Sequence, residues 1–385
     1  MKKGYLFISN GFKPSQQEAE SIEPIAPSSF SRAAIYAANK MGWELHMGVN
    51  RNHPEKIEGI GYDIKFYNQH TYRSIFALRD NWRAYKNLCK YIKENPQIEI
   101  IHCNTPIGGV IGRLAGRKFK KKVIYTAHGF HFYKGAPLIN RTLFKWIEQY
   151  LAHYTDCLIT INKEDFQAAQ HFKLKKDGKV WYVPGVGIDL KGFEELVDRS
   201  PIRRRLGISE EAVICISIGD LNNNKNTITQ IKAIQKIEND NIYLLICGIG
   251  PNHDTLLDYI NSHNLGNKIK LLGFRKDIKD LLGASDIFIM SSKREGLPRS
   301  TMEAMAVGLP CIVSKIRGNA DLIENHKGGY LIDPLNIQGF AQAIEEISKN
   351  KTLQVEMGKF NKGRVDSFAI HKVHKELESI FSTLN

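Results

Sequence analysis

The sequence of 385 residues lacks long hydrophobic runs. Its longest apolar stretch, from Ile242 to Gly250, is far shorter than the roughly 20 residues that a membrane-spanning helix requires. The amino terminus also lacks the extended apolar region and cleavage site of a secretory signal peptide. We therefore expect a cytoplasmic protein without a membrane span.

Cysteine is scarce, and the six that occur show no paired spacing of the kind found in disulfide frameworks or zinc sites. Four of them lie in apolar runs and are expected to be small core residues in a reducing compartment: Cys89, Cys157, Cys215 and Cys247. His128 and His131 are three positions apart, but no further ligands accompany them. The sequence therefore predicts no metal site.

Several catalytic motifs are missing as well. There is no Walker A motif, no G-x-G-x-x-G after the first expected strand and no G-x-S-x-G turn. The segment Gly248-Ile249-Gly250 stops at two glycines. These absences count against a simple nucleotide triphosphatase or a dehydrogenase.

The whole chain has a net charge of +14, and one half has far fewer acidic than basic residues. Residues 1–180 hold 28 Lys and Arg against 15 Asp and Glu, whereas residues 181–385 hold 26 against 25. This asymmetry indicates an anionic partner for the first half, whether nucleic acid, an anionic lipid leaflet or a phosphorylated substrate.

Aromatic residues favour the lipid leaflet among these partners. They interleave with basic residues over one stretch with helical spacing: Tyr72, Arg73, Arg79, Trp82, Arg83, Tyr85, Lys86 and Lys90. Such a face suits the surface of an anionic membrane. No recognised nucleic-acid motif accompanies it, so we expect peripheral association with the inner face of the cell membrane and no nucleic acid.

Short apolar, β-branched runs alternate with longer amphipathic stretches along the chain. The expected strands are 5–9, 44–49, 64–66, 98–103, 123–127, 157–161 and 180–183, and then 213–218, 242–247, 269–272, 287–290 and 311–314. Helical patterns cover residues such as 30–41, 82–94, 143–152 and 227–237. This alternation predicts an α/β protein whose parallel sheets carry helices on both faces.

The series of strands restarts after Pro184-Gly185-Val186-Gly187, where a hinge is expected. We therefore predict two doubly wound domains, 1–187 and 188–364, that face a central cleft. A final helix over 365–385 is expected to pack back across them. In such folds, ligands bind at the carboxyl ends of the strands.

The strongest chemical signal follows the expected strand Ile287–Met290. A polar loop there carries Glu295 and Gly296, and a helix is expected to begin near Ser300. Free N–H groups at a helix amino terminus can bind a diphosphate, and the carboxylates of Glu295 and Glu303 can accept hydrogen bonds from sugar and ribose hydroxyls. Ser300 and Glu303 also fit a capping box, a role that Glu303 could hold together with ligand binding.

With its Gly-Leu-Pro loop and Ala-Met-Ala helix, this constellation resembles the retaining glycosyltransferases of family 4, which have the GT-B fold of two Rossmann-like domains. The resemblance extends over nearly the whole chain. It implies that Glu295 contacts the donor sugar and Glu303 the ribose. Lys225, in the loop after Ile218, matches the lysine that neutralises the donor phosphates. Asp220 departs from the family pattern, in which an arginine is usual.

The resemblance also implies the remaining donor-binding residues of the second domain: Gly219, Asn226, Gly250, Phe274, Arg275, Gly296, Leu297, Pro298, Arg299, Ser300 and Glu303. The loop that carries Phe274 usually lies beside the nucleobase, and a backbone contact there would recognise uracil. Arg294 or Arg299 could take the place of the arginine that Asp220 replaces.

In the first half, Ala127–Phe132, together with Asp156–Asn162 and Val183–Asp189, resembles a bacterial subgroup that builds capsular and exopolysaccharide repeat units. His128 matches the histidine that faces the donor sugar, which implies a catalytic role beside Lys225 and Glu295. Acceptors of this subgroup are typically sugars on a polyprenyl diphosphate. The segment from Asn10 to Ser29 is unusually long for such a connection, so we expect it to line the acceptor side through Gly11, Ser28 and Ser29.

Together these features predict the retaining transfer of a hexose or N-acetylhexosamine from a nucleotide-diphosphate sugar, with UDP favoured, to a lipid-linked glycan. Neither metal nor cofactor is expected, because Lys225 and the helix amino terminus would stabilise the leaving diphosphate. Two alternatives stay open. The chain could be a sugar-nucleotide epimerase of the same fold, or a membrane scaffold that binds nucleotide sugars without catalysis.

Overall fold

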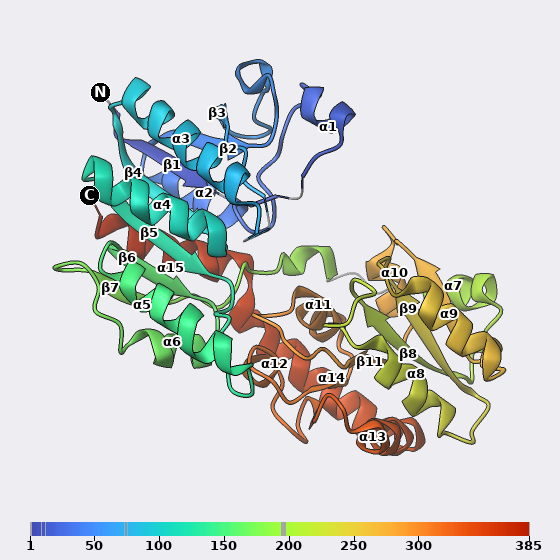
Figure 1. The fold of residues 1–385 in the computed structure, drawn as a ribbon. Coiled ribbons are helices and arrows are strands. Elements are labelled where there is room, and N and C mark those ends of the chain that lie inside the picture. The colour runs from blue at the N-terminus through green and yellow to red at the C-terminus, as the bar shows by residue number, and fades with distance from the viewer. Residues whose placement is uncertain are drawn as a thin grey trace. The chain divides into compact units, whose positions relative to one another are not determined.

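The structure is a computed structural model that describes residues 2–8, 10–11, 13–72, 74, 76–193 and 198–384. Arg73 of the expected basic face and Ser9 at the end of the first expected strand lie outside these residues. The chain forms two compact units (Figure 1). Unit 1 comprises Met1–Val186 and His371–Asn385, and unit 2 comprises Gly187–Ile370.

Unit 1 contains a seven-stranded sheet in which all neighbours are parallel. Its strands are β1 (Gly4–Ile8), β2 (Glu44–Val49), β3 (Ile64–Asn68), β4 (Ile98–Asn104), β5 (Lys122–Ala127), β6 (Cys157–Thr160) and β7 (Lys179–Tyr182). The order is β3-β2-β1-β4-β5-β6-β7, so the direction of winding reverses between β1 and β4. A reversal of this kind creates the crevice in which doubly wound sheets bind ligands.

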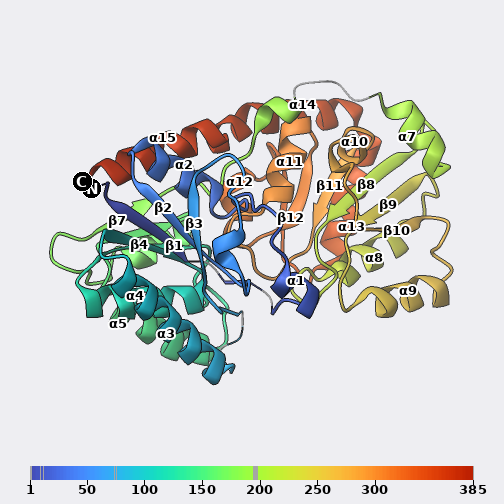
Figure 2. The ribbon, with the colours of Figure 1, turned by 90° about the horizontal axis from the view of Figure 1, so that it is seen from above.

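Helices cover both faces of this sheet (Figure 2). One face carries α2 (Arg32–Lys40) and α15 (Ile370–Ser382), and the other carries α3 (Leu78–Glu94), α4 (Pro106–Phe119), α5 (Lys145–Ala152) and α6 (Lys163–Ala169). Each face has its own apolar cluster, with Phe381 of α15 in one and Leu88 of α3 in the other. A short helix, α1 (Gln16–Glu20), interrupts the long connection between β1 and α2.

Unit 2 contains a six-stranded parallel sheet in the order β10-β9-β8-β11-β12-β13. Its strands are β8 (Val213–Ile218), β9 (Ile242–Cys247), β10 (Ile269–Gly273), β11 (Ile287–Met290), β12 (Cys311–Ser314) and β13 (Gly329–Ile332). Its helices are α7 (Arg199–Leu206), α8 (Thr227–Gln235), α9 (His253–Ser262), α10 (Ile278–Gly283), α11 (Arg299–Val307), α12 (Asn319–Leu322), α13 (Ile337–Lys349) and α14 (Lys351–Val365). Here the winding reverses between β8 and β11.

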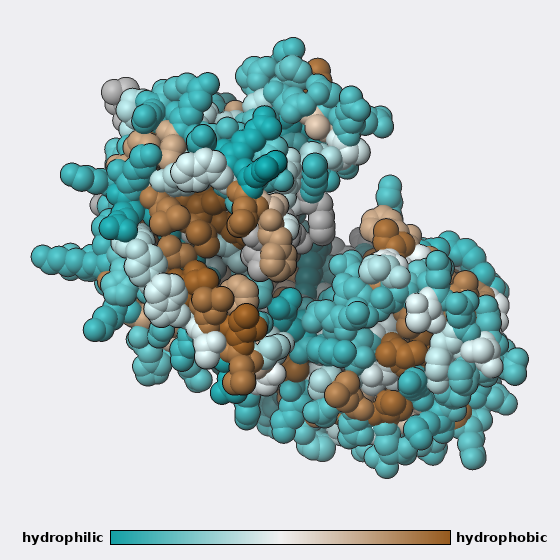
Figure 3. Space-filling model, viewed as in Figure 1, coloured by the Kyte–Doolittle hydropathy of each residue, from teal (hydrophilic) through white to brown (hydrophobic). Residues whose placement is uncertain are grey.

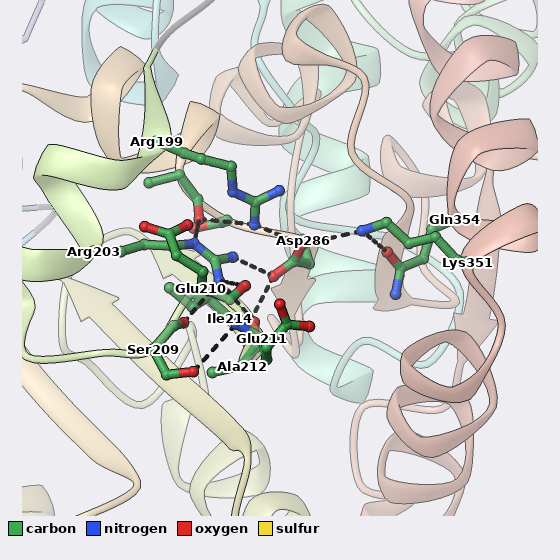
Figure 4. Close-up of polar contacts among 12 residues, drawn as sticks. Arg199, Arg203, Ser209, Glu210, Glu211, Ala212, Ile214, Asp286, Lys351 and Gln354 are labelled. Carbon is green, nitrogen blue, oxygen red and sulfur yellow. Dashed lines mark hydrogen bonds and ion pairs between the residues drawn. The ribbon is translucent and has the colours of Figure 1, made fainter.

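A buried ion pair fixes α7 to the sheet of unit 2 (Figure 4). The guanidinium of Arg203 is fully buried and donates to the carboxylate of Asp286 at 2.7 Å. It also donates to three backbone carbonyls between Ser209 and Ala212, while Asp286 accepts from the backbone N–H of Ile214. Because these bonds satisfy the two charges inside unit 2, we assign the pair a structural role.

The predicted α/β class and the two doubly wound sheets are confirmed. The four cysteines expected in the core are buried. Strand β13 was not predicted, because Gly329–Ile332 is short and three of its four residues are only half-buried. Within the described ranges, no helix combines the length and apolar character needed to cross a bilayer.

Candidate active site

Lys225 and Glu295 meet where the winding of unit 2 reverses. The loop after β8 carries Lys225, and the loop after β11 carries Glu295. The Lys225 Nζ and the Glu295 Oε1 lie 2.8 Å apart. Their side chains are only 22% and 13% exposed, so this ion pair is partly desolvated. A charged pair in this position can bind a polar, anionic ligand at the reversal point.

Local backbone geometry sets the place of Lys225. The side-chain oxygen of Asn222 accepts hydrogen bonds from the backbone N–H groups of Asn224 and Lys225, which folds the loop into a tight turn. A Cβ atom on Gly219 would lie 3.1 Å from the Cε of Lys225. The glycine therefore leaves the space through which the lysine reaches Glu295.

Asn226 joins this loop to the end of β11. Its backbone adopts the left-handed conformation with a φ of 54°. Its side-chain amide donates to the carbonyls of Ser291 and Pro334 at 3.2 and 2.8 Å. The buried amide is thus engaged within the protein, and Asn226 positions the loop that carries Lys225.

Two neighbouring loops pack closely against the same place. A Cβ on Gly250 would lie 2.5 Å from the carbonyl oxygen of Leu221, so the loop after β9 requires glycine there. A Cβ on Gly318 would lie 2.3 Å from the carbonyl oxygen of Gly296. The loop after β9 therefore packs against the loop of Lys225, and the loop after β12 packs against the loop of Glu295.

Helix α11 begins at Arg299, with the buried Pro298 at the capping position and Leu297, also buried, before it. Ser300 is the second residue of the helix, and no side chain forms a capping hydrogen bond at the start of α11. The predicted capping box of Ser300 and Glu303 is therefore wrong. Pro298 takes the cap position in an extended conformation, which moves Ser300 into the first turn.

Glu303 instead pairs with Arg299 of the same helix, whose Nε lies 2.9 Å from the Glu303 Oε1. Burial raises the pKa of Glu303, and Arg299 opposes that effect. The capping box of this chain lies elsewhere, between Ser15 and Glu18 at the start of α1. An arginine four residues before Glu303 was the sequence signal for this pairing.

Asp220 is exposed and stands where the family usually has an arginine, so another cation is expected to take the place of that arginine. The structure offers a candidate for this cation that the sequence analysis missed. Arg294 is exposed, and Arg299 is engaged by Glu303. Arg317, only 7% exposed, donates from its Nε to the carbonyl oxygen of Glu295 at 3.3 Å. Its signal was its position just after β12, at the edge where ligands bind.

Phe274 and Arg275 follow the edge strand β10, two strands from β8. Phe274 is 70% exposed. Arg275 forms a two-point contact with the carboxylate of Asp277. The carbonyl oxygen of Gly273 accepts from the backbone N–H of Gly248, which connects this loop to the loop after β9. The described contacts thus link these residues to the Lys225 region only indirectly.

In unit 1, His128 follows β5 and lies beside Asn104. The His128 Nε2 and the Asn104 Nδ2 are 3.5 Å apart, and the Phe30 ring packs against the imidazole in a T-shaped arrangement with centroids 5.1 Å apart. Partial burial lowers the pKa of His128 to about 4. The ring is therefore neutral at neutral pH, and its buried Nδ1 has no hydrogen-bond partner among the described residues.

Asn10 and Asn104 are further functional candidates that the sequence analysis missed. Asn10 lies two residues after β1 and Asn104 is the last residue of β4, the two strands between which the winding of unit 1 reverses. Both side chains are buried, yet the Oδ1 atom of each lacks a partner within the described parts of the chain. Buried polar atoms without partners carry an energetic cost that a bound ligand can relieve. Their sequence signal was a polar residue directly after the expected strands 5–9 and 98–103.

The expected acceptor residues lie in the connection between β1 and α2. Gly11 donates from its N–H to the carbonyl oxygen of Thr71 at 3.2 Å. Ser28 is exposed and Ser29 half-buried, and both precede Phe30, which brings this segment to His128. Phe30 was not predicted as a site residue.

No group of three or more His, Cys, Asp or Glu side chains that could hold a metal ion occurs in the described portion of the chain. Lys225 and Arg317 both donate to Glu295, and the free backbone N–H groups at the start of α11 follow four residues later along the chain. These are groups that bind phosphate oxygens.

Residues 36–190 match the family described as Glycosyltransferase Family 4, and residues 198–364 match the family described as Glycosyl transferases group 1. EpsD of Bacillus subtilis, provisionally named a glycosyltransferase, is 32% identical over 352 residues, which cover 89% of this chain and 90% of EpsD. The UDP-Gal:α-D-GlcNAc-diphosphoundecaprenol α-1,3-galactosyltransferase of Escherichia coli is 29% identical, with 80% of this chain and 81% of the relative covered.

Solved structures share the fold over the full length. HepE of Anabaena in complex with UDP superposes with a TM-score of 0.77 at 17% identity, covering 99% of this chain and 100% of HepE. Sucrose-phosphate synthase from Thermosynechococcus elongatus gives a TM-score of 0.81 at 18% identity and covers 99% of both chains. At such identities the likeness shows the fold alone.

Proposed function

Because the chain belongs to the family 4 glycosyltransferases, with relatives in bacterial polysaccharide biosynthesis, we propose that it transfers a hexose or N-acetylhexosamine from a UDP-sugar to a lipid-linked glycan. The observation that carries this proposal is the ion pair of Lys225 and Glu295 at the reversal point of unit 2. In this proposal unit 2 binds the donor and unit 1 binds the acceptor.

Lys225 is suited to the donor diphosphate. An ammonium group has three N–H donors, and Glu295 accepts from one of them, which leaves donors for phosphate oxygens. The N–H groups at the start of α11 add further positive potential. Arg317, beside the same loop, is the cation that we propose in place of the arginine absent at Asp220.

Glu295 and Glu303 are suited to hydroxyl groups. Glu295 is fixed by Lys225 and would accept from a sugar hydroxyl. Glu303 is fixed by Arg299 and would accept from the ribose. In this arrangement each carboxylate is oriented before the donor arrives, which lowers the entropy lost on binding.

We propose retention at the anomeric carbon, by attack from the face on which the nucleotide leaves. The acceptor oxygen forms a bond to the anomeric carbon while the bond from that carbon to the diphosphate breaks. The acceptor proton moves to an oxygen of the departing diphosphate. Lys225 then stabilises the negative charge that grows on the leaving group, so this proposal requires no metal or other cofactor.

The acceptor is proposed to be a sugar on a polyprenyl diphosphate, like the acceptor in the name of the Escherichia coli relative. In unit 1, the unpartnered oxygens of Asn10 and Asn104 are suited to accept hydrogen bonds from sugar hydroxyls. The net charge of residues 1–180 would attract both the diphosphate and an anionic leaflet. We therefore propose a cytoplasmic protein attached peripherally to the inner face of the membrane.

A panel of labelled nucleotide sugars, incubated with the protein and membrane lipid extract, tests this function. We expect lipid-linked label from one donor, with the anomeric configuration of the donor kept in the product. Formation of an epimer without lipid would support the epimerase instead. Binding of a nucleotide sugar without any turnover across the panel would support the scaffold.

A further inference from the structure

Helix α5 and the π-helical turn before it (Asn140–Phe144) expose an apolar ridge on unit 1. The ridge consists of Leu138, Ile139, Leu143, Trp146 and Tyr150. Leu138, Ile139 and Trp146 are 75%, 60% and 61% exposed. Ile139, Leu143, Trp146 and Tyr150 are spaced four, three and four positions apart, which places them on one face of the helix. The α5 ridge is therefore an apolar helix face that unit 1 does not cover.

The apolar surface continues beyond α5. Brown, apolar surface gathers over α4 and α5 in Figure 3. Helices α3 and α5 both contact α4, and the start of α3 exposes Phe76, Leu78 and Trp82, with Phe76 88% exposed. Soluble monomers rarely expose a contiguous apolar patch of this kind unless it binds something.

Cations accompany the aromatic rings of this surface. The Nζ of Lys86 lies 5.5 Å from the centroid of the Trp82 ring. The Nζ of Lys118 lies 5.7 Å from the ring of Tyr85, and the guanidinium of Arg117 lies 4.5 Å from the ring of Tyr154. An apolar centre with basic and aromatic residues around it matches the interface between lipid headgroups and acyl chains.

The basic surroundings also decide between two occupants. A second copy of this chain that binds through the same surface by two-fold symmetry would bring two equally basic patches together, each with Arg117, Lys118 and Lys86. Like charges facing each other oppose such a dimer. Anionic lipid headgroups instead neutralise these cations while the acyl chains cover the apolar side chains.

We propose that the α5 ridge inserts into the acyl boundary of an anionic leaflet and anchors unit 1 there. The segment Asn140–Ala152 is too short to span a bilayer, so it lies in the plane of the interface. This inference rests on the proposed action on a lipid-linked acceptor and extends it, because charge alone would leave the protein on the headgroups. Insertion of apolar side chains contributes membrane affinity that, unlike electrostatic attraction, is not screened by salt.

Tryptophan fluorescence tests the insertion directly. Trp82 and Trp146 are the strongly exposed tryptophans, whereas Trp43 is buried and Trp181 half-buried. A change in emission of a Trp82→Phe variant on vesicle binding therefore reports on Trp146. With vesicles that contain about one third anionic lipid, we expect a blue shift of the emission and quenching by lipids brominated along their acyl chains. An unshifted, unquenched Trp146 in vesicle-bound protein would overturn the proposal.

Vesicle co-sedimentation of the full chain provides the second readout. At high salt, we expect the double variant Leu143→Gln/Trp146→Gln to bind vesicles about tenfold or more weakly than the unmodified protein, because two apolar side chains no longer bury surface among the acyl chains. Val355→Gln, which changes a 62% exposed side chain of unit 2, is the matched control and should bind as the unmodified protein does. Equal binding by all three proteins would contradict insertion.

Two further measurements separate the possible failures. Sedimentation velocity would reveal a dimer, and a dimer abolished by the double variant would show that a second copy occupies the ridge, which overturns the proposal. Transfer to a short-chain, water-soluble acceptor should be unchanged in the double variant. If the unmodified protein transfers no sugar but inserts into vesicles, the proposed function fails and the membrane inference stands.

Discussion

Lys225 and Glu295 are 70 positions apart in the sequence, yet their side chains meet at 2.8 Å where the sheet of unit 2 reverses its winding. Each side chain comes from a loop at the carboxyl end of a central strand. Because both are partly buried, the attraction between them is less screened than in water. The pair holds a cation and a carboxylate in fixed positions before any ligand binds.

Replacement of Lys225 by Ala should weaken binding of a nucleoside diphosphate about a hundredfold and binding of the nucleoside little. The lost interaction is with the phosphates, and hydrogen bonds to charged groups contribute about 1.5–3 kcal/mol. Titration calorimetry with UDP and uridine measures both. Lys236→Ala changes an exposed lysine after α8 and serves as the control. Equal weakening for both ligands would remove Lys225 from the phosphate site.

A methyl group on Gly219 should displace Lys225 without unfolding the protein. The added Cβ would lie 3.1 Å from the lysine Cε, and the φ of Gly219 is +155°. We expect Gly219→Ala to weaken UDP binding about tenfold. Gly207→Ala, at a glycine of unit 2 that also has a positive φ of +66° and where nothing lies within 4 Å of the added Cβ, is the matched control. Unchanged UDP affinity in Gly219→Ala would show that the lysine does not depend on this space.

His128 should remain neutral well below its ordinary titration range, because loss of hydration lowers its pKa to about 4. Between pH 6.5 and 4 the unfolded chain then binds more protons at this residue than the folded one, so His128 destabilises the fold as the pH falls. The Cε1 proton resonance, assigned with His128→Asn, measures the titration. A midpoint near 6.5 would contradict the burial of this ring.

Replacement of Asp286 by Asn should lower the free energy of unfolding of unit 2 by about 3–5 kcal/mol, because it leaves the buried charge of Arg203 without its counter-charge. Urea unfolding of the full chain measures the loss. Asp240→Asn removes the 85% exposed partner of Lys268 and should cost about 1 kcal/mol or less. Similar losses in both variants would mean that the Arg203 network is not the anchor of α7.

The fold was predictable to a large extent, because apolar, β-branched runs alternate with amphipathic stretches along the chain. The strands Glu44–Val49, Val213–Ile218 and Ile242–Cys247 have the predicted bounds. Strand β13 was not predicted because it has only four residues and three of them are half-buried, so its apolar signal was weak.

The candidate site was predictable where its residues follow strands in a recognisable family pattern, as Lys225 and Glu295 do. Pairings between side chains were harder to predict. Ser300 and Glu303 fit a capping box by spacing, but Pro298 and Arg299 decide the outcome. The roles of Asn10 and Asn104 depend on which strands become neighbours, and sequence order alone does not contain that information.

The most direct test of the central claim compares sugar transfer by the unmodified protein and by Glu295→Gln at saturating donor. Glu295 joins the cation Lys225 to the place proposed for the sugar, and Gln keeps its shape while removing its charge. We expect the turnover of a folded Glu295→Gln protein to fall about a hundredfold or more. Turnover within about twofold of the unmodified protein would contradict the assignment of this pair to the active site.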